Sequence, residues 1–238
     1  MDNSRYISQF LFFKNLNYKI LNSSATIIGV GGLGSWVAEI LARIGVKKLI
    51  IVDPDVVEEK NLNRQNYTIK DVGKLKIDAL EDRIKNIRDD IIIEKYKEIN
   101  ENIFNTDIFF DAVDNIETKY LLNEYSVYLD KPYIFGSVAE NKGYVGLINP
   151  KNFCFYDIFK GKRDVITCNL SGLDPTILFL ASSLMVKLFI DYINGKREGI
   201  LYHINLSGKT IIEEIKVKNY NCPICVHKNY QIIWRYMK

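Results

Sequence analysis

The sequence predicts an α/β fold with a mostly parallel central sheet, helices on both faces and a C-terminal antiparallel extension. Apolar runs at residues 26–30, 47–52 and 107–113 lack a helical period, which is typical of strands buried on both faces of a parallel sheet. Between them, residues 36–44 and 73–88 carry apolar side chains at spacings of three and four, which predicts amphipathic helices laid on that sheet. Further strand-like runs complete the predicted sheet at residues 90–96, 133–138, 144–148, 201–206 and 210–217.

The length of 238 residues suits one large α/β domain. We expect a nucleotide-binding core at about 24–150, a crossing loop at about 150–172, and a C-terminal part at 173–238 with a helix, strands and a C-x-x-C motif. The 32 basic and 29 acidic residues give a net charge of +3, which is too small for a general nucleic-acid-binding surface. Four cysteines in a chain of this size favour metal binding or thiol chemistry over a disulfide framework.

The most apolar stretch of the chain lies at residues 175–192. Asp174, Lys187 and Asp191 bracket only about 12 apolar residues, so we expect a buried helix, open to a role at a dimer interface, and no membrane span. Residues 1–20 lack the layout of a signal peptide. We therefore expect a cytoplasmic protein.

A glycine-rich turn follows the first predicted strand. Gly29, Gly31 and Gly34 form the pattern G-x-G-x-x-G, and Gly32 lies within it. Such a turn needs positive φ, a backbone close to phosphate and tight helix–strand contact, which glycine allows because it lacks a Cβ. The helix that follows directs its free N–H groups at an anion. The pattern predicts a Rossmann-like nucleotide site.

The second predicted strand ends in Asp53, whose carboxylate can accept hydrogen bonds from ribose hydroxyls. Up to this point a nicotinamide or flavin enzyme remains open. The polar cluster Asn61, Asn63, Arg64 and Gln65 follows beyond the carboxyl end of that strand, where ligands bind in open α/β sheets. An arginine beside the phosphates has little use in hydride transfer, so the cluster favours phosphate chemistry.

Two further charged residues are candidates for the same site. Lys76 lies in the predicted helix at residues 73–88, although helical spacing alone does not separate it from Lys74. Asp114 directly follows the strand at residues 107–113, where a carboxylate can help to hold Mg²⁺ against phosphates. Alternatively, Asp114 only caps the helix that begins near Ile116.

Taken together, the segments GVGGLG, VDPD, NLNRQ, GKLKID, DAVDNIETK and CPIC resemble the ubiquitin-activating-enzyme-like adenylyltransferases, the ThiF/MoeB/HesA family. The resemblance runs from about Arg5 to Cys225, nearly the whole chain. It implies ATP- and Mg²⁺-dependent adenylylation of the C-terminal carboxylate of a small ubiquitin-like sulfur carrier, with release of pyrophosphate, for thiamin, molybdopterin or tRNA thiolation. It also implies a homodimer, with a sulfurtransferase or cysteine desulfurase as a further partner.

The resemblance assigns roles to the residues already singled out. Arg64 supplies a fixed cationic fork, Lys76 a charge on the triphosphate, and Asp114 a ligand for Mg²⁺. Adenosine is placed by Asp53 with Gly29, Gly31, Gly32 and Gly34, while Asn61 and Gln65 are hydrogen-bonding partners at the same rim.

Three features depart from the family pattern or add to it. Ser8 stands where the family has an arginine that reaches into the partner's ATP site, so Arg5 or Lys14 substitutes or the contact is absent. The family's structural Zn²⁺ would be held by Cys222, Cys225 and Cys154, with Asp157 or His227 as the fourth ligand, unless the site has decayed. Cys168 matches a family cysteine that in some members takes part in acyl or persulfide chemistry, and nearby Lys160, Lys162 and Arg163 would raise its thiolate fraction.

Other functions share this core. A tRNA-modifying dehydratase of the same superfamily, a peptide-modifying adenylase and a non-catalytic nucleotide-binding subunit are the alternatives. The terminal CPIC motif and the modest charge argue against the first, and intact Arg64, Lys76 and Asp114 argue against the last.

Overall fold

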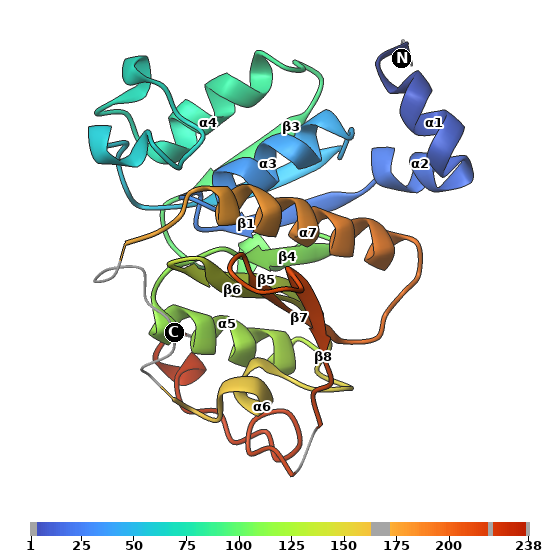
Figure 1. The fold of residues 1–238 in the computed structure, drawn as a ribbon, viewed down its shortest axis with the longest axis vertical. Helices are drawn as coiled ribbons and strands as arrows, with labels where there is room; N and C mark the ends of the chain where they lie inside the picture. Colours follow the sequence, from blue (N-terminus) through green and yellow to red (C-terminus); the bar gives the residue numbers. More distant parts are fainter. Residues whose placement is uncertain (1–3, 163–171, 219–220, 237–238) are drawn as a thin grey trace.

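A computed structural model describes residues 4–162, 172–218 and 221–236 and contains one eight-stranded sheet (Figure 1). The strands are β1 (Ser24–Ile28), β2 (Lys48–Val52), β3 (Ile92–Tyr96), β4 (Ile108–Asp111), β5 (Tyr133–Ala139), β6 (Lys142–Ile148), β7 (Ile200–Asn205) and β8 (Ile212–Ile215). The α-helices are α1 (Ile7–Phe13), α2 (Asn15–Leu21), α3 (Gly34–Arg43), α4 (Lys76–Lys85), α5 (Ile116–Tyr128), α6 (Phe155–Phe159) and α7 (Thr176–Ile193).

The strand order β3-β2-β1-β4-β5-β6-β7-β8 confirms the predicted fold class. Neighbouring strands from β3 to β5 are parallel, and β6, β7 and β8 each pair antiparallel with the strand before them. The chain passes from β1 to β2 and β3 on one side, then returns to place β4 on the other side of β1. Ligands bind at such a reversal, beyond the carboxyl ends of the strands.

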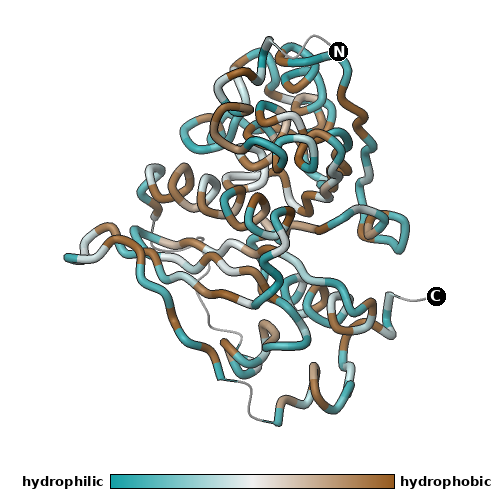
Figure 2. Tube along the Cα trace, turned by 90° about the vertical axis from the view of Figure 1, so that its right-hand side faces the viewer, coloured by the Kyte–Doolittle hydropathy of each residue, from teal (hydrophilic) through white to brown (hydrophobic). Residues whose placement is uncertain are grey.

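Two hydrophobic clusters, one on each face, hold the helices to the sheet (Figure 1). The first joins α3, α4 and α7 to inward-facing residues such as Ile27 and Leu49. The second joins α5, α6 and the segment after residue 221 to residues such as Ile28 and Ile50, the sequence neighbours that point to the opposite face. Figure 2 shows hydrophobic residues along the helices and strands and many hydrophilic residues in the outer loops. Burial on both faces explains the continuous apolar runs in the strands.

Helix α7 is long and apolar enough to cross a membrane by length and composition, with a mean hydropathy of 1.7. It instead packs against α3, β5 and β6, and half of its 18 residues are buried. Its packing is that of the predicted buried core helix.

Two local features were not located from the sequence pattern. The N-terminal segment forms two short helices because Lys14, between α1 and α2, has a left-handed φ of 50°. The irregular region after residue 150 contains the short helix α6, which begins directly after Cys154. The start of α6 is a local capping box in which the Asp157 carboxylate accepts from the Cys154 amide at 2.8 Å, and apolar periodicity does not report such a contact.

Candidate active site

A cavity of about 760 Å³ opens at the carboxyl ends of β1, β2 and β4, at the point where the strand order reverses. Its wall combines glycine backbone, charged side chains and an apolar region. The sequence-predicted residues on this wall are Gly29, Gly31, Gly32, Asp53, Arg64, Gln65, Lys76 and Asp114. The fold therefore brings most of the predicted nucleotide-binding residues to one surface.

The glycine turn between β1 and α3 has little room for side chains. Gly29 has a φ of +83°, and a Cβ there would lie 2.8 Å from the Ala112 carbonyl oxygen. A Cβ on Gly34 would lie 1.9 Å from the carbonyl oxygen of Gly29, so the turn closes only with glycine at this position. A Cβ on Gly31 would meet only the Gln65 amide, at 3.7 Å, because that glycine faces the cavity. The turn thus presents backbone to a ligand, as the motif predicts.

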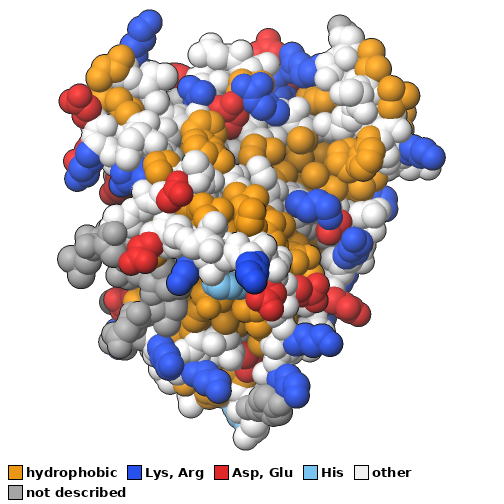
Figure 3. All heavy atoms as spheres, viewed as in Figure 1, with side chains coloured by type: hydrophobic (Ala, Val, Ile, Leu, Met, Phe, Trp, Pro, Cys, Tyr) orange, Lys and Arg blue, Asp and Glu red, His pale blue; other side chains and the backbone are white. Residues whose placement is uncertain are grey.

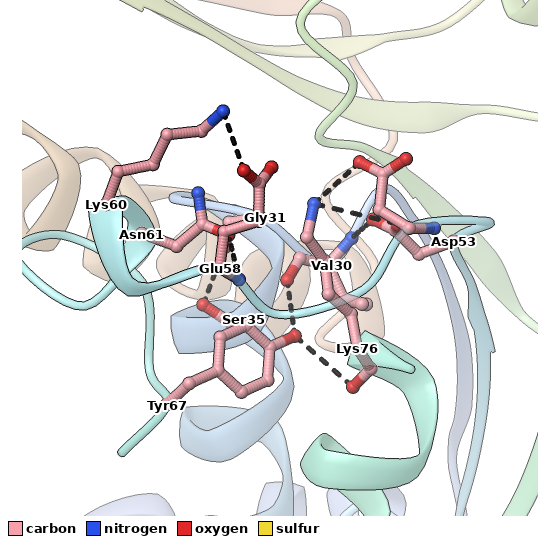
Figure 4. A network of polar contacts seen from close by, with 10 residues as sticks. Val30, Gly31, Ser35, Asp53, Glu58, Lys60, Asn61, Tyr67 and Lys76 are labelled. Atoms are coloured by element: carbon pink, nitrogen blue, oxygen red, sulfur yellow. Dashed lines mark hydrogen bonds and ion pairs between the residues drawn. The ribbon is translucent and has the colours of Figure 1, made fainter. Parts of the chain in front are cut away.

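Asp53 fastens this turn to the end of β2 (Figure 4). One carboxylate oxygen accepts from the Val30 amide at 2.8 Å, and the other accepts from the Asp55 amide at 2.9 Å. From the other side the hydroxyl of Tyr67 donates to the Val30 carbonyl oxygen at 2.7 Å. Burial raises the pKa of Asp53, while the charge of Lys76 opposes that shift. Each carboxylate oxygen keeps lone-pair capacity for a ribose hydroxyl.

The structure separates the two lysines that the sequence leaves equivalent. The Lys76 ammonium lies 2.7 Å from Asp55 and 3.8 Å from Asp53, and only 9% of its side chain is exposed. Lys74 instead faces solvent and pairs with Asp71 and Asp82. Only Lys76 borders the cavity, where an anionic ligand would compete with Asp55 for its charge.

Arg64 lies at the rim of the cavity with donors to spare. Its Nη1 donates to the Lys60 carbonyl oxygen at 2.9 Å and to Asn63 at 3.0 Å. Its carbonyl oxygen accepts from the Trp36 indole at 3.0 Å, which ties this loop to α3. Within residues 4–162, 172–218 and 221–236, the Nε and Nη2 groups make no hydrogen bond, so the guanidinium can still take a phosphate or carboxylate.

The two amides predicted beside Arg64 have different positions. Gln65 borders the cavity, and its Oε1 is buried with no hydrogen-bond partner among the described residues. The Asn61 side chain accepts from the Glu58 amide at 2.9 Å and closes the 3₁₀ turn Glu59–Asn61 (Figure 4). Asn63, and not Asn61, is on the cavity wall. Asn61 thus shapes the loop that carries the rim residues.

Asp114 is exposed at the cavity, and the helix cap is its neighbour Asn115. The Asn115 side chain accepts from the Thr118 amide at 2.8 Å and begins α5. Asp114 has no hydrogen bond or ion pair to any residue that the structure describes. Its carboxylate therefore remains available for a ligand of the cavity, which argues against the capping alternative.

A second cluster lies away from the cavity, where α6 meets the segment after residue 221. The ligand atoms of Cys154, Asp157, Cys222 and Cys225 all lie within 4.8 Å of one another. Two of the sulfurs, on Cys154 and Cys222, are 3.6 Å apart, and the sulfur of Cys225 is 3.3 Å from an Asp157 oxygen. Tetrahedral Zn²⁺ with Zn–S bonds of about 2.3 Å needs sulfurs about 3.8 Å apart. The donor set and its spacing fit zinc.

The predicted alternatives for the fourth ligand separate clearly. Asp157 belongs to the cluster, whereas His227 is exposed and its Nε2 lies 2.5 Å from the Asn221 side chain. The hydrogen bond from Cys222 lowers the pKa of Cys154, but the bond with Cys225 and burial outweigh it and raise that pKa to about 12. The bond with Cys154 and burial raise the pKa of Cys222. A cation is what would draw these thiols into the thiolate form.

The remaining predicted residues lie elsewhere. Ser8 is on α1 and exposed, and Arg5 pairs with Asp90 at 3.9 Å, before β3 and thus at the amino ends of the strands. Lys14 joins α1 to α2. None of the three borders the cavity of its own chain. Cys168 lies outside the described residues.

The structure adds cavity residues that the sequence reasoning missed. Asp55 belongs to the VDPD segment, but its contact with the Lys76 ammonium is known only from the structure. Lys97, Glu98 and Ile99 follow β3 and form one wall, and Tyr236 joins them from the far end of the described chain. No local pattern marks these four positions, because strand order brings them together.

The comparisons with known proteins agree with this geometry. A model of the ThiF family matches residues 4–224. The chain belongs to the ThiF family. It is 26% identical over 223 residues to the SAMP-activating enzyme E1 of Haloferax volcanii, covering 87% of this chain and 82% of that protein. It is 28% identical over 226 residues to the sulfur carrier protein adenylyltransferase of Thermus thermophilus, covering 87% and 83%.

A longer ThiF-family relative shares only part of its length with the chain. The adenylyltransferase and sulfurtransferase MOCS3 of Dictyostelium discoideum is 32% identical over 230 residues, which cover 88% of this chain and 53% of that protein. The named relatives are adenylyltransferases of the ThiF/MoeB type, and the chain is an enzyme of this type. The crystal structure of E. coli MccB with SeMet MccA has the same fold, with a TM-score of 0.80 at 22% identity over 94% of this chain and 75% of that one.

Proposed function

We propose that the protein adenylylates the C-terminal carboxylate of a small ubiquitin-like sulfur-carrier protein, with ATP as the donor and pyrophosphate as the leaving group. The observation that carries the proposal is the convergence of Arg64, Lys76 and Asp114 with the glycine turn on one cavity. The relatives named for SAMP activation and for sulfur carrier adenylylation, each matched over more than four fifths of its length, support this substrate class.

The reaction asks the protein mainly to position charges. A carboxylate oxygen attacks the α-phosphorus of ATP, an acyl–oxygen–phosphorus linkage forms, and the bond to pyrophosphate breaks. The attacking group is already ionised, so no general base is needed. Arg64 and Lys76 would neutralise charge on the phosphate oxygens, and Asp53 would hold the ribose. The Lys76 ammonium is already in position before ATP binds, because the fold holds it beside the carboxylates of Asp55 and Asp53.

Two metals belong to the proposal. Mg²⁺ would be held by Asp114 with the phosphates, and its charge would offset that of the triphosphate. Zn²⁺ would be structural, held by Cys154, Asp157, Cys222 and Cys225. It would join the start of α6 to the segment after residue 221 and would take no part in the reaction.

The proposal includes a homodimer. Exposed apolar side chains gather over α1, α2 and α7, a band seen in Figure 3 that includes Leu11, Phe12, Tyr18 and Phe179. Apolar patches of this kind mark protein interaction sites. Arg5 lies at the amino ends of the strands, so it can reach an ATP cavity only in a second copy. Light scattering after gel filtration measures the mass in solution; a monomer at all concentrations contradicts this part.

Exchange of labelled pyrophosphate into ATP tests the function. We expect exchange with Mg²⁺ and a carrier that ends in Gly-Gly, and none when the terminal glycine of that carrier is deleted. The Asp114→Ala variant should lose exchange. Its control is the Lys74→Ala variant, which should keep exchange. Exchange with a short peptide but not with the carrier would overturn the carrier assignment and support a peptide adenylase. Robust hydride transfer from a nicotinamide would overturn adenylylation.

A further inference from the structure

Tyr236 is part of the cavity wall although it stands 122 residues after Asp114 (236 − 114). The tail segment that carries it (residues 229–236) runs beside α5 and ends in the 3₁₀ turn Ile233–Arg235. Within the described part of the chain, no hydrogen bond or ion pair joins this segment to the glycine turn or to the proposed phosphate-binding residues. The position of Tyr236 therefore has its own structural cause.

Glu124 of α5 holds the tail segment in place. Its carboxylate, with the residue only 3% exposed, accepts hydrogen bonds from the amides of Gln231, Ile232 and Ile233, each at 2.8 Å. Hydrogen bonds to a charged acceptor are among the stronger ones in proteins. Ile233 is fully buried in the same hydrophobic cluster as α5. Three bonds and one buried side chain fix the backbone three residues before Tyr236.

Aromatic contacts add to this anchor. Tyr128, one turn beyond Glu124 on α5, lies edge-on to Tyr230 and Trp234, with ring centroids 6.0 and 6.2 Å apart. Tyr230 and Trp234 also contact each other, at 5.8 Å. The segment is thus fastened on both sides of the Glu124 bonds, which limits the volume that the Tyr236 side chain can sample.

The cavity is lined from both faces of the sheet. The glycine turn leads into α3 and Lys76 begins α4, and both helices pack on one face, so this side suits phosphates. Leu121 of α5, with Ile99 and Val113 packed against the same cluster, belongs to the other face, and Lys97, Glu98 and Tyr236 also line the cavity. A nucleotide with its phosphates on the first side and its ribose at Asp53 places its base against the other side.

We propose that Tyr236 forms one wall of the base-binding side of the site and stacks on the adenine of ATP, and that Glu124 is a positioning residue that holds it there. This inference rests on the proposed function, because it takes ATP as the ligand. It assigns the nucleotide site a contribution from the tail segment, which lies beyond the region matched by the family model, residues 4–224.

Calorimetric titration of the full chain with Mg-ATP and with Mg-tripolyphosphate tests the proposal. Tyr236→Ala should raise the Kd for ATP about 5- to 150-fold, the scale for losing one base–aromatic stack. The same variant should leave the Kd for tripolyphosphate unchanged, since that ligand has no base. Tyr236→Phe keeps the ring and should bind ATP as the wild type does. Arg235→Ala is the matched control, because Arg235 is the preceding residue and is not on the cavity wall.

A double-mutant cycle tests the positioning role. In Glu124→Gln, an NH₂ group replaces one carboxylate oxygen, and because NH₂ cannot accept a hydrogen bond, at least one of the three backbone amides loses its acceptor. The tail segment is then held less firmly, so ATP binding should weaken when Tyr236 is present. In the Tyr236→Ala background the same change should have no further effect, which a purely structural role would not produce. Wild-type affinity of Tyr236→Ala for ATP, or an equal loss for ATP and tripolyphosphate, overturns the inference. Either result leaves the proposed function intact. The proposed function fails on a different result, namely wild-type protein that binds ATP but shows no carrier-dependent exchange.

Discussion

Zinc binding by the Cys154, Asp157, Cys222 and Cys225 cluster should be steeply pH-dependent. Two of its thiols, Cys154 and Cys222, have raised pKa values, that of Cys154 to about 12. Both are therefore protonated at neutral pH when no metal is bound. Zinc takes the thiolate, so each of these thiols gives up one proton when the ion binds.

The magnitude follows from this count of protons. With at least two protons released, the apparent association constant rises about 100-fold for each unit of pH. Acidification therefore favours the metal-free protein and alkaline conditions favour the loaded protein. Metal loss frees the start of α6 from the segment after residue 221, which are joined through this cluster. Removal of zinc by a chelator should lower the melting temperature, and the difference between the loaded and the metal-free protein should be larger at higher pH, where zinc binds more tightly.

Competition with a chromogenic chelator at several pH values between about 6 and 8 measures this slope. Protein purified without added zinc should hold one ion per chain, Cys222→Ala should hold none, and His227→Ala should hold one because that histidine is outside the cluster. A pH slope corresponding to clearly fewer than two protons contradicts the assignment of two protonated thiols. A content below about 0.2 ions per chain refutes the metal site, because a structural site binds zinc tightly.

Three further predictions concern the cavity. Arg64→Ala should lower pyrophosphate exchange at least about 100-fold, the scale of one lost electrostatic contact in a transition state, with an unchanged melting temperature; equal exchange contradicts its role. Lys76→Ala should lose exchange while Lys74→Ala keeps it, since Lys74 makes only solvent-exposed ion pairs; equal rates in the two contradict the assignment. Gly34→Ala should cost about 1–3 kcal/mol or more of stability because its Cβ meets the Gly29 oxygen, whereas Gly31→Ala should melt as wild type does; denaturant unfolding decides between them.

The local parts of the fold were predictable from the sequence. Continuous apolar runs located β1, β2 and β4 within a few residues, because these strands are buried on both faces. The more exposed β3 and β8 were located by their strand-like composition. The glycine turn was equally predictable, since a Cβ at Gly29 or Gly34 would meet backbone. Asp53 at the end of β2 follows from the same strand–turn–helix unit.

Choices between chemically similar neighbours were beyond the sequence. Lys74 and Lys76 share one helical pattern, and only the packing of α4 shows that Lys76 is the one buried at the cavity. Asp114 and Asn115 can both cap a helix, and the structure assigns the cap to Asn115. Tyr236 is on the cavity wall because of the Glu124 bonds, a contact across more than 100 positions that no motif announces.

The most direct measurement follows an oxygen atom. In the proposed reaction a carrier carboxylate attacks the α-phosphorus of ATP, so a carrier labelled with ¹⁸O in its C-terminal carboxylate should pass label to AMP when hydroxylamine cleaves the product. We predict AMP with one ¹⁸O atom by mass spectrometry, together with unlabelled pyrophosphate and a carrier hydroxamate. Label in inorganic phosphate with formation of ADP, or AMP without label, would contradict adenylylation of the carboxylate.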